Sequence, residues 1–148
     1  MSDIDIKGVQ LSSLKNIKVE GGNVMHALKK SDSSFQGFGE AYFSCIHSNA
    51  IKAWKKHKKM TLNLIVPVGI IKFVIHDETF VNQKKFNTIM LSADNYYRLT
   101  INPGLWVGFM GMSEKTSILL NIANIEHDPD EVEKAPKSKF KYDWKGKQ

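Results

Sequence analysis

Residues 94–109 read DNYYRLTINPGLWVGF, and they contain two short extended segments on either side of a tight turn. Residues 97–101 and 105–109 are rich in β-branched and aromatic side chains, which favour strands. The turn between them is Asn102-Pro103-Gly104, and a proline followed by glycine is typical of a turn. This stretch therefore predicts two neighbouring β-strands.

Segments of the same kind recur along the whole chain. Nine short runs of β-branched and aromatic residues, bounded by Gly, Pro, Asn and Asp, span residues 14–19, 24–28, 39–46, 60–66, 70–76, 86–91, 97–101, 105–109 and 117–125. No segment keeps an apolar stripe of helical period over three turns. The sequence therefore predicts an all-β fold, either an antiparallel sandwich or a barrel.

The chain has 148 residues, of which 42% are hydrophobic, and this predicts one domain over 1–148 with its core at about 14–127. The segment 128–148 is polar, and its aromatic residues at 140–144 are expected to dock it back on the body. The single cysteine, Cys45, is expected to be a buried thiol, which suits a reducing compartment. Since no signal sequence or membrane-spanning stretch is visible, the prediction is a cytoplasmic protein.

The chain carries 21 basic and 15 acidic residues, a formal net charge of +6. Such an excess suits nucleic acid, an anionic membrane or a phosphorylated small molecule. All the basic residues but Arg98 are lysines, whereas nucleic-acid surfaces use arginine for bidentate and stacking contacts. The composition therefore argues against nucleic acid, and the chain offers no segment for a membrane partner.

Residues 50–59 read AIKAWKKHKK and hold five lysines, a histidine and a tryptophan. In a regular strand the side chains alternate, which places Lys52, Trp54 and Lys56 on one face and Lys55 and His57 on the other. The run is either a solvated edge whose lysines deter aggregation or part of a binding site. A metal site is not predicted, because the five histidines include no H-x-H pair.

The strand–turn–strand stretch at 94–109 resembles the N-x-x-x-L-x-I-P-x-G-x-x-H-G-F segment of the dTDP-4-keto-6-deoxyglucose 3,5-epimerases, which are cupins. In the same order, residues 21–24 fall at the D-x-R-G turn of that family and 52–57 at its R-G-x-H motif. Residues 60–77 resemble its K-x-x-x-V-x-x-G hairpin. The resemblance covers residues 20–144, and it implies a cupin jelly-roll barrel (a double-stranded β-helix), a homodimer and no cofactor.

The resemblance also implies roles for single residues. The diphosphate-binding arginine of the family falls on Lys52 and its catalytic base on His57, although five residues separate this pair where the family has three. The phosphate-binding lysine of the family falls on Lys59. Its histidine-orienting aspartate falls on Asp143, which makes Asp143 the predicted partner of His57.

The clearest departure from the family lies at Asn121, where the family has the tyrosine that donates a proton. An amide cannot act as an acid, so the resemblance leaves His57 to transfer protons alone or with help from His127 or Tyr97. The residues predicted to bind substrate, besides the two lysines already named, are Asn63, Lys72, Trp106 and Asn121.

The activity implied is epimerisation or isomerisation by proton transfer next to the ketone of a nucleotide-linked 4-keto deoxysugar, in surface-polysaccharide precursor synthesis. This chemistry needs a neutral base, a hydrogen-bond donor near the ketone oxygen and an acid, and it needs no metal or redox cofactor. The missing tyrosine favours a 3,4-ketoisomerase within this class. The alternatives are a non-catalytic cupin that binds a nucleotide sugar or glycan, and a basic nucleic-acid-binding barrel with Trp54 for stacking.

Overall fold

The computed structural model describes residues 6–79 and 86–146, which form twelve strands, two single-turn 3₁₀ helices and no α-helix. The strands are β1 (Val9–Ser13), β2 (Asn16–Val19), β3 (Gly22–Met25), β4 (Glu40–Ile46), β5 (Ile51–His57), β6 (Leu62–Val68), β7 (Ile70–His76), β8 (Asn87–Ser92), β9 (Tyr97–Ile101), β10 (Trp106–Gly111), β11 (Ser117–Ala123) and β12 (Val132–Lys134). The 3₁₀ helices are η1 (Pro129–Glu131) and η2 (Lys137–Lys139). The predicted all-β fold is confirmed.

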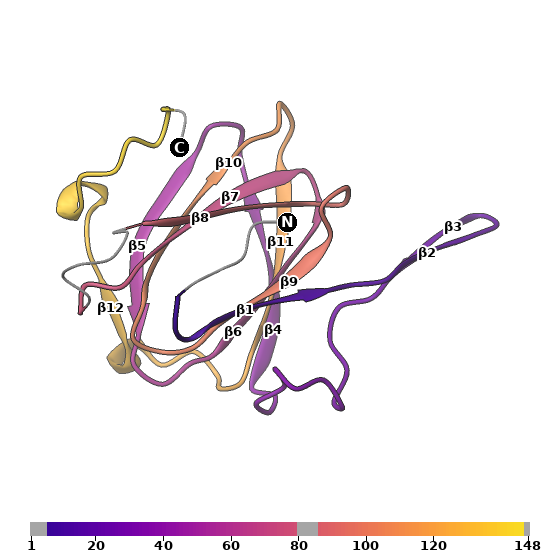
Figure 1. Ribbon diagram of the computed structural model, residues 1–148, viewed down its shortest axis with the longest axis horizontal. Coiled ribbons are helices and arrows are strands. Elements are labelled where there is room, and N and C mark those ends of the chain that lie inside the picture. Colours follow the sequence, from indigo (N-terminus) through magenta and orange to yellow (C-terminus); the bar gives the residue numbers. More distant parts are fainter. Residues whose placement is uncertain (1–5, 80–85, 147–148) are drawn as a thin grey trace.

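Two five-stranded antiparallel sheets face each other (Figure 1). We call the sheet with the strand order β1-β9-β6-β11-β4 sheet A, and the sheet with the order β12-β5-β10-β7-β8 sheet C. Each of the nine predicted segments overlaps a strand, whereas β1, β5 and β12 lie outside all nine. β5 falls in the lysine-rich run 50–59 and lies inside sheet C, between β12 and β10, so this run is not a sheet edge. β1 and β12 lie at sheet edges, where pairing with a neighbour, rather than an apolar pattern of their own, holds the backbone extended.

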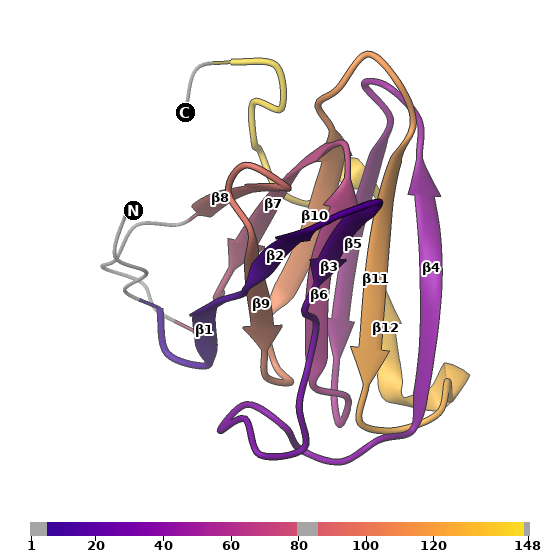
Figure 2. The same cartoon turned by 90° about the vertical axis from the view of Figure 1, so that its right-hand side faces the viewer.

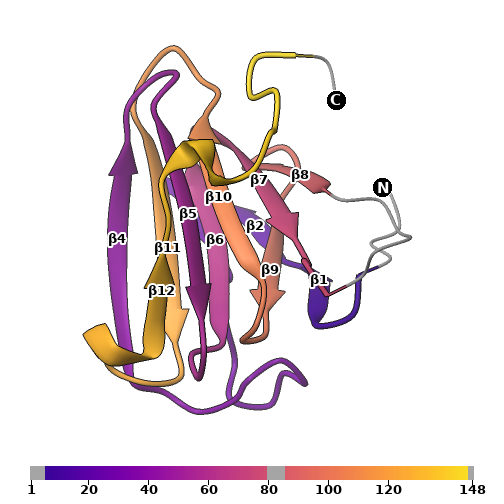
Figure 3. The ribbon, with the colours of Figure 1, turned by 90° about the vertical axis from the view of Figure 1, so that its left-hand side faces the viewer.

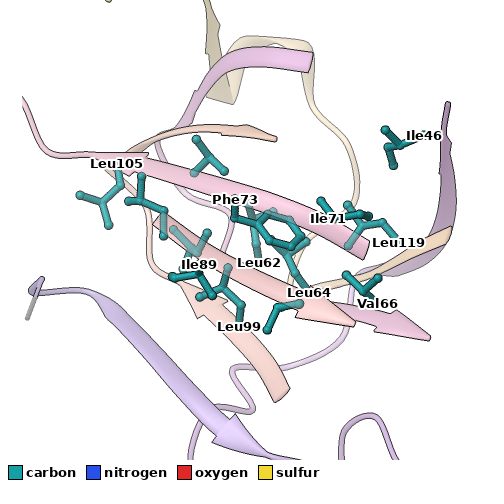
Figure 4. Close-up of a cluster of buried hydrophobic side chains, with 14 of the residues drawn as sticks. Ile46, Leu62, Leu64, Val66, Ile71, Phe73, Ile89, Leu99, Leu105 and Leu119 are labelled. Carbon is teal, nitrogen blue, oxygen red and sulfur yellow. The ribbon is translucent and has the colours of Figure 1, made fainter. Parts of the chain in front are cut away.

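The main core fills the space between the sheets (Figure 4). The side chains of Leu62, Leu64 and Val66 point into it from β6, as the alternation of that strand predicts. Phe73 lies in the same cluster with no exposed surface. Each buried side chain of this size stabilises the fold by about 1.5–3 kcal/mol, so the core holds the two sheets together.

The C-terminal segment crosses the outer face of sheet C (Figure 3). Trp144 packs against Trp54, Val74 and Trp106 in a second apolar cluster, and its carbonyl oxygen accepts a hydrogen bond of 2.7 Å from Lys72 Nζ. A Cβ at Gly108 would lie 2.9 Å from the Trp144 ring, so the close approach depends on this glycine. The outer face of sheet C is thus covered by the chain itself.

Sheet A is less covered. The β2–β3 hairpin extends away from the barrel (Figures 1 and 2), and strand β4 is a free edge of the sheet. Phe43 is 67% exposed on the outer side of β4. Cys45 is exposed as well, so the expectation of a buried thiol is wrong, because alternation along this edge strand turns Cys45 outward together with Phe43.

Candidate active site

A cavity of about 630 Å³ opens between the two sheets. The residues that line it from sheet A and the loop that follows β11 are Glu40, Tyr42, Ser44, Leu62, Leu64, Leu119, Asn121 and His127. Those that line it from sheet C and the segment after β12 are Lys52, Ala53, Trp54, Lys55, His57, Val107, Phe109, Val132, Lys134 and Ala135, and Met60 lies between β5 and β6. The volume and the mixture of an apolar floor with a few polar groups suit a small-molecule ligand.

A β-bulge in β5 decides which lysines face this cavity. Lys55 pairs with Val107 of β10, whereas Lys52 pairs with Phe109, so three steps along β5 match only two along β10. Paired residues of antiparallel strands point to the same side, and Val107 and Phe109 share a side because they are two apart. Lys52, Lys55 and His57 therefore all face the cavity. Regular alternation had predicted Lys52 on the opposite face from His57, and the bulge corrects this.

His57 is held by a buried carboxylate. Its Nδ1 lies 2.5 Å from Oε1 of Glu131, whose side chain is only 1% exposed. The backbone N–H groups of Lys59 and Met60 donate to Oε2 of Glu131, each at 3.1 Å. Asp128 caps the short helix η1 that carries Glu131, since its side chain accepts a hydrogen bond from Asp130 N.

The environment of Glu131 sets the role of each nitrogen of His57. Burial by itself raises the pKa of the Glu131 carboxyl, but the hydrogen bonds from His57 and the two backbone amides outweigh burial and lower this pKa overall. The carboxylate therefore stays ionised near neutral pH and can only accept hydrogen bonds. The hydrogen of the neutral imidazole then lies on Nδ1, which leaves Nε2 of His57 as the nitrogen able to take a proton.

The predicted partner of His57, Asp143, lies elsewhere. Its Oδ1 accepts hydrogen bonds from the backbone N–H groups of Lys145 at 3.2 Å and Gly146 at 3.0 Å, which form a turn in the C-terminal segment. That segment covers the outer face of sheet C, away from the cavity. Glu131 takes the place that the sequence had assigned to Asp143.

Three lysines form a cationic wall beside His57. Lys134 of β12 is paired directly with Lys55 of β5, and Lys52 lies on the same side of β5. Burial, followed by the charges of Lys134 and Lys52, lowers the pKa of Lys55. Like charges that face each other across strands destabilise a sheet, so a bound anion would relieve this cluster.

A tyrosine faces the cavity from the sheet opposite His57. Tyr42 of β4 is paired with Asn121 of β11, and Asn121 Nδ2 lies 3.0 Å from Tyr42 Oη. Sequence reasoning missed Tyr42, because the resemblance pointed to Asn121 for the acid and to His127 or Tyr97 for help. The pairing of β4 with β11, which no local pattern indicates, brings a phenol to the side of that asparagine.

Four of the predicted site residues line the cavity, namely His57, Lys52, Asn121 and His127. The backbone N–H of His127 donates to Glu40 Oε1 at 2.6 Å, which ties the loop after β11 to the start of β4. Their placement on the walls of one cavity brings together residues up to 75 positions apart in the sequence.

The other predicted substrate-binding or assisting residues do not line the cavity. Asn63 points to the outer side of sheet A, where its Oδ1 accepts a hydrogen bond of 2.6 Å from Thr100 Oγ1. Tyr97 packs against the main core from β9. Lys59 follows the end of β5 and contributes its backbone N–H to Glu131.

Lys72 and Trp106 belong to the outer face of sheet C instead of the cavity. Lys72 Nζ lies 5.6 Å from the ring centre of Tyr142 and 5.8 Å from that of Trp144. Trp106 stacks edge-on against Phe140 at 5.7 Å. Both residues therefore pack against the C-terminal segment on the side of sheet C that faces away from the cavity.

The architecture and the sequence of this chain are similar to those of known proteins. No family model matches the chain. The crystal structure of a dTDP sugar isomerase from Desulfovibrio desulfuricans G20 has a TM-score of 0.89 and is 36% identical, with 97% of this chain and 94% of that one covered. The chain belongs to the cupin-fold dTDP-sugar isomerase and 3,5-epimerase family. The family resemblance and the jelly-roll fold expected from the sequence are confirmed.

Two more distant relatives match this chain over most of their own length. A dTDP-4-dehydrorhamnose 3,5-epimerase from Sulfolobus tokodaii is 20% identical with a TM-score of 0.81, and 97% of this chain and 85% of that one are covered. The spore coat polysaccharide biosynthesis protein SpsL of Bacillus subtilis is 22% identical over 128 residues, which is 85% of each chain.

Among residues 6–79 and 86–146, no group of three or more His, Cys, Asp or Glu side chains is arranged to hold a metal ion. Nor does this part of the chain contain a helix long and apolar enough to cross a membrane.

Proposed function

We propose that the protein is an epimerase or isomerase that transfers a proton at a carbon next to the ketone of a nucleotide-linked 4-keto deoxysugar. The observation that carries this proposal is the His57–Glu131 pair, which faces Tyr42 across a cavity lined by lysines. The family includes a dTDP sugar isomerase and a dTDP-4-dehydrorhamnose 3,5-epimerase, and a relative acts in spore coat polysaccharide biosynthesis. The proposed pathway is therefore the supply of precursors for a surface polysaccharide.

The first step is removal of a proton from carbon. A hydrogen next to a ketone is acidic because the electron pair of the broken C–H bond delocalises onto the ketone oxygen as an enolate. His57 Nε2 takes this proton, and the carboxylate of Glu131 stabilises the imidazolium that forms.

The second step returns a proton to carbon. The Tyr42 hydroxyl gives its proton to the enolate, the C–H bond forms, and a phenolate is left on Tyr42. His57 lies on sheet C and Tyr42 on sheet A, so removal and delivery take place from opposite walls. Delivery to the same carbon from the opposite face inverts it. Delivery to the former ketone carbon instead moves the carbonyl, as in a ketoisomerase, when the hydroxyl of the neighbouring carbon loses its proton to become the new ketone and the former ketone oxygen takes up a proton.

The diphosphate of the nucleotide would bind at the cationic wall. Lys52, Lys55 and Lys134 present three ammonium groups along one side of the cavity. Charge-assisted hydrogen bonds from lysines suit phosphate oxygens, and binding this handle supplies energy remote from the reacting carbon. The sequence had assigned this role to Lys52 and Lys59, and we now assign it to Lys52 with the two other lysines.

Solvent deuterium exchange tests the proposed function. The protein is incubated in D₂O with a dTDP-4-keto-6-deoxyglucose, and NMR follows deuterium at the carbons next to the ketone and the identity of the product. His57→Asn should reduce exchange by about 10²–10⁴-fold while dTDP affinity stays within a few-fold. The matched control is His47→Asn, at an exposed histidine outside the cavity.

A binding measurement separates the enzyme from the two alternatives, a non-catalytic cupin and a nucleic-acid-binding barrel. Thermal shift with dTDP and with oligonucleotides reports binding, because a ligand of the native state raises its melting temperature. Binding of dTDP without exchange into any keto sugar would reject the enzyme in favour of a non-catalytic binding cupin. Stabilisation by oligonucleotides alone would reject both.

We also propose that two copies associate through the outer side of sheet A. The side chains on this side of β4 and β11 are all uncharged and apolar: Ala41, Phe43, Cys45, Ile118, Leu120 and Ile122. Since each copy carries a net charge of +6, two copies can approach closely only where no lysines meet. Light scattering should find a dimer that Phe43→Glu converts to a monomer; a monomeric wild type would exclude this assembly.

The proposed location is the cytoplasm. Cys45 is exposed and unpaired, and a free exposed thiol suits a reducing compartment. Labelling of Cys45 by a thiol reagent in denaturant, which also separates any dimer, directly after cell lysis tests this, and a thiol already blocked would contradict it.

A further inference from the structure

We infer that Asn121 is a positioning residue that holds the Tyr42 hydroxyl ready to deliver its proton, an inference that rests on the proposed function. The two residues are direct partners in the pairing of β4 with β11. Asn121 Nδ2 donates to Tyr42 Oη at 3.0 Å, and Asn121 is only 3% exposed. The contact therefore joins a buried amide on β11 to the phenol of its direct partner on β4.

Stability does not explain an asparagine at this position. Its neighbours along the inner side of β11 are Leu119 and Ala123, and its partner on β6 is Leu64, all of them apolar and buried. Within the described part of the chain, the buried Oδ1 of Asn121 accepts no hydrogen bond. A buried polar atom without a partner costs stability, so a leucine would suit this wall better than an asparagine does.

The direction of the hydrogen bond gives Asn121 its use. An amide –NH₂ group can only donate, so Tyr42 Oη is the acceptor, and the hydrogen of the phenol is not consumed by this contact. When that proton leaves for the enolate carbon, the oxygen becomes a phenolate and the bond from Asn121 becomes charge-assisted. The contact thus strengthens as the reaction proceeds, which is the condition for accelerating a step.

The same contact explains how the chain departs from its family. The resemblance places the family's proton-donating tyrosine at Asn121. In this chain, Tyr42 approaches from the adjacent strand, and directly paired residues on neighbouring strands have Cβ atoms only about 5 Å apart. Moving the phenol across one strand pair keeps an acid on this wall of the cavity, and the asparagine becomes its donor.

The test separates proton removal from proton delivery. His57 can exchange substrate hydrogen with solvent on one face by itself, whereas product formation also needs delivery from Tyr42. For Asn121→Leu we expect product formation to fall about 10–100-fold, the change that loss of one charge-assisted hydrogen bond produces. Deuterium exchange into recovered substrate and the KM should stay within a few-fold of wild type, and the melting temperature should be equal or higher.

A double-variant comparison shows whether Asn121 acts through Tyr42. Tyr42→Phe alone should also lose product formation and keep exchange, and adding Asn121→Leu to it should cause no further loss. The matched control is Ser48→Ala, which removes a hydroxyl from an exposed position outside the cavity, in the turn between β4 and β5. Equal product rates in Asn121→Leu and wild type, or additive losses in the double variant, would overturn the inference. A wild type that shows no exchange would instead reject the proposed function.

Discussion

Replacing Glu131 by glutamine should leave the protein folded but remove its base. Glu131 now accepts three hydrogen bonds, one from His57 Nδ1 and two from the backbone N–H groups of Lys59 and Met60. Glutamine has one accepting oxygen. If this oxygen faces the two backbone amides, the –NH₂ group faces His57 and donates to Nδ1, and all of these groups remain paired.

This arrangement reverses the tautomer of His57. With Nδ1 accepting from the introduced amide, the ring hydrogen moves to Nε2, which then cannot take a proton from the substrate. The opposite rotamer would keep the tautomer but bury two unpaired amides, at about 1–3 kcal/mol each. Glu131→Gln should therefore adopt the reversed tautomer and lose about 10²–10⁴-fold in deuterium exchange.

Glu131→Gln should also make the folded protein less stable. Three hydrogen bonds to a charged group become neutral ones, at a difference of about 1 kcal/mol each, so the free energy of unfolding should fall by about 2–3 kcal/mol. Deuterium exchange measures the loss of the base, urea denaturation measures the loss of stability, and ¹⁵N NMR of the imidazole shows the tautomer of His57. The matched control is Glu133→Gln, at an exposed carboxylate 3.5 Å from Lys56. Exchange within a few-fold of wild type, with Nδ1 still protonated, would refute the reasoning.

Three further outcomes follow from the structure. Lys134→Ala removes a like charge opposite Lys55, so the free energy of unfolding should stay equal or rise by about 0.2–1 kcal/mol. The affinity for dTDP should weaken about tenfold. Thermal unfolding and calorimetry measure these two effects, and a loss of stability together with the loss of affinity would contradict the reasoning. Trp144→Ala should cost about 3–5 kcal/mol in urea denaturation because it empties the second cluster, and a loss below about 1 kcal/mol would mean that the segment is not anchored there. The pKa of Glu131 is lowered in the folded state, so its stabilisation is full above the ordinary glutamate pKa and is lost as pH falls through the folded-state value. Urea midpoints between about pH 6 and about pH 2 should fall less steeply for Glu131→Gln than for wild type, and parallel curves would exclude this contribution.

Local patterns were sufficient for the fold class. Alternation along β6 places Leu62, Leu64 and Val66 on one side regardless of what packs against them, since successive side chains of a strand point in opposite directions. The Asn102-Pro103-Gly104 turn likewise restricts its own backbone. Motif order along the chain was enough to indicate the family and to bring Lys52 and His57 to notice.

Contacts between distant segments decided the site. The extra residue in β5 turns Lys52 toward His57, and its presence depends on the register with β10, which no residue of β5 specifies alone. Glu131 lies 74 positions from His57, and Tyr42 lies 79 positions from Asn121. A carboxylate or a phenol looks the same at any position in the sequence, and only the closure of two sheets around a cavity selects the one that meets its partner. The sequence by itself thus determined most of the strands, the faces of regular strands such as β6, and the family, whereas strand register and loop closure in the tertiary structure determined which side chains form the base, the acid and the cationic wall.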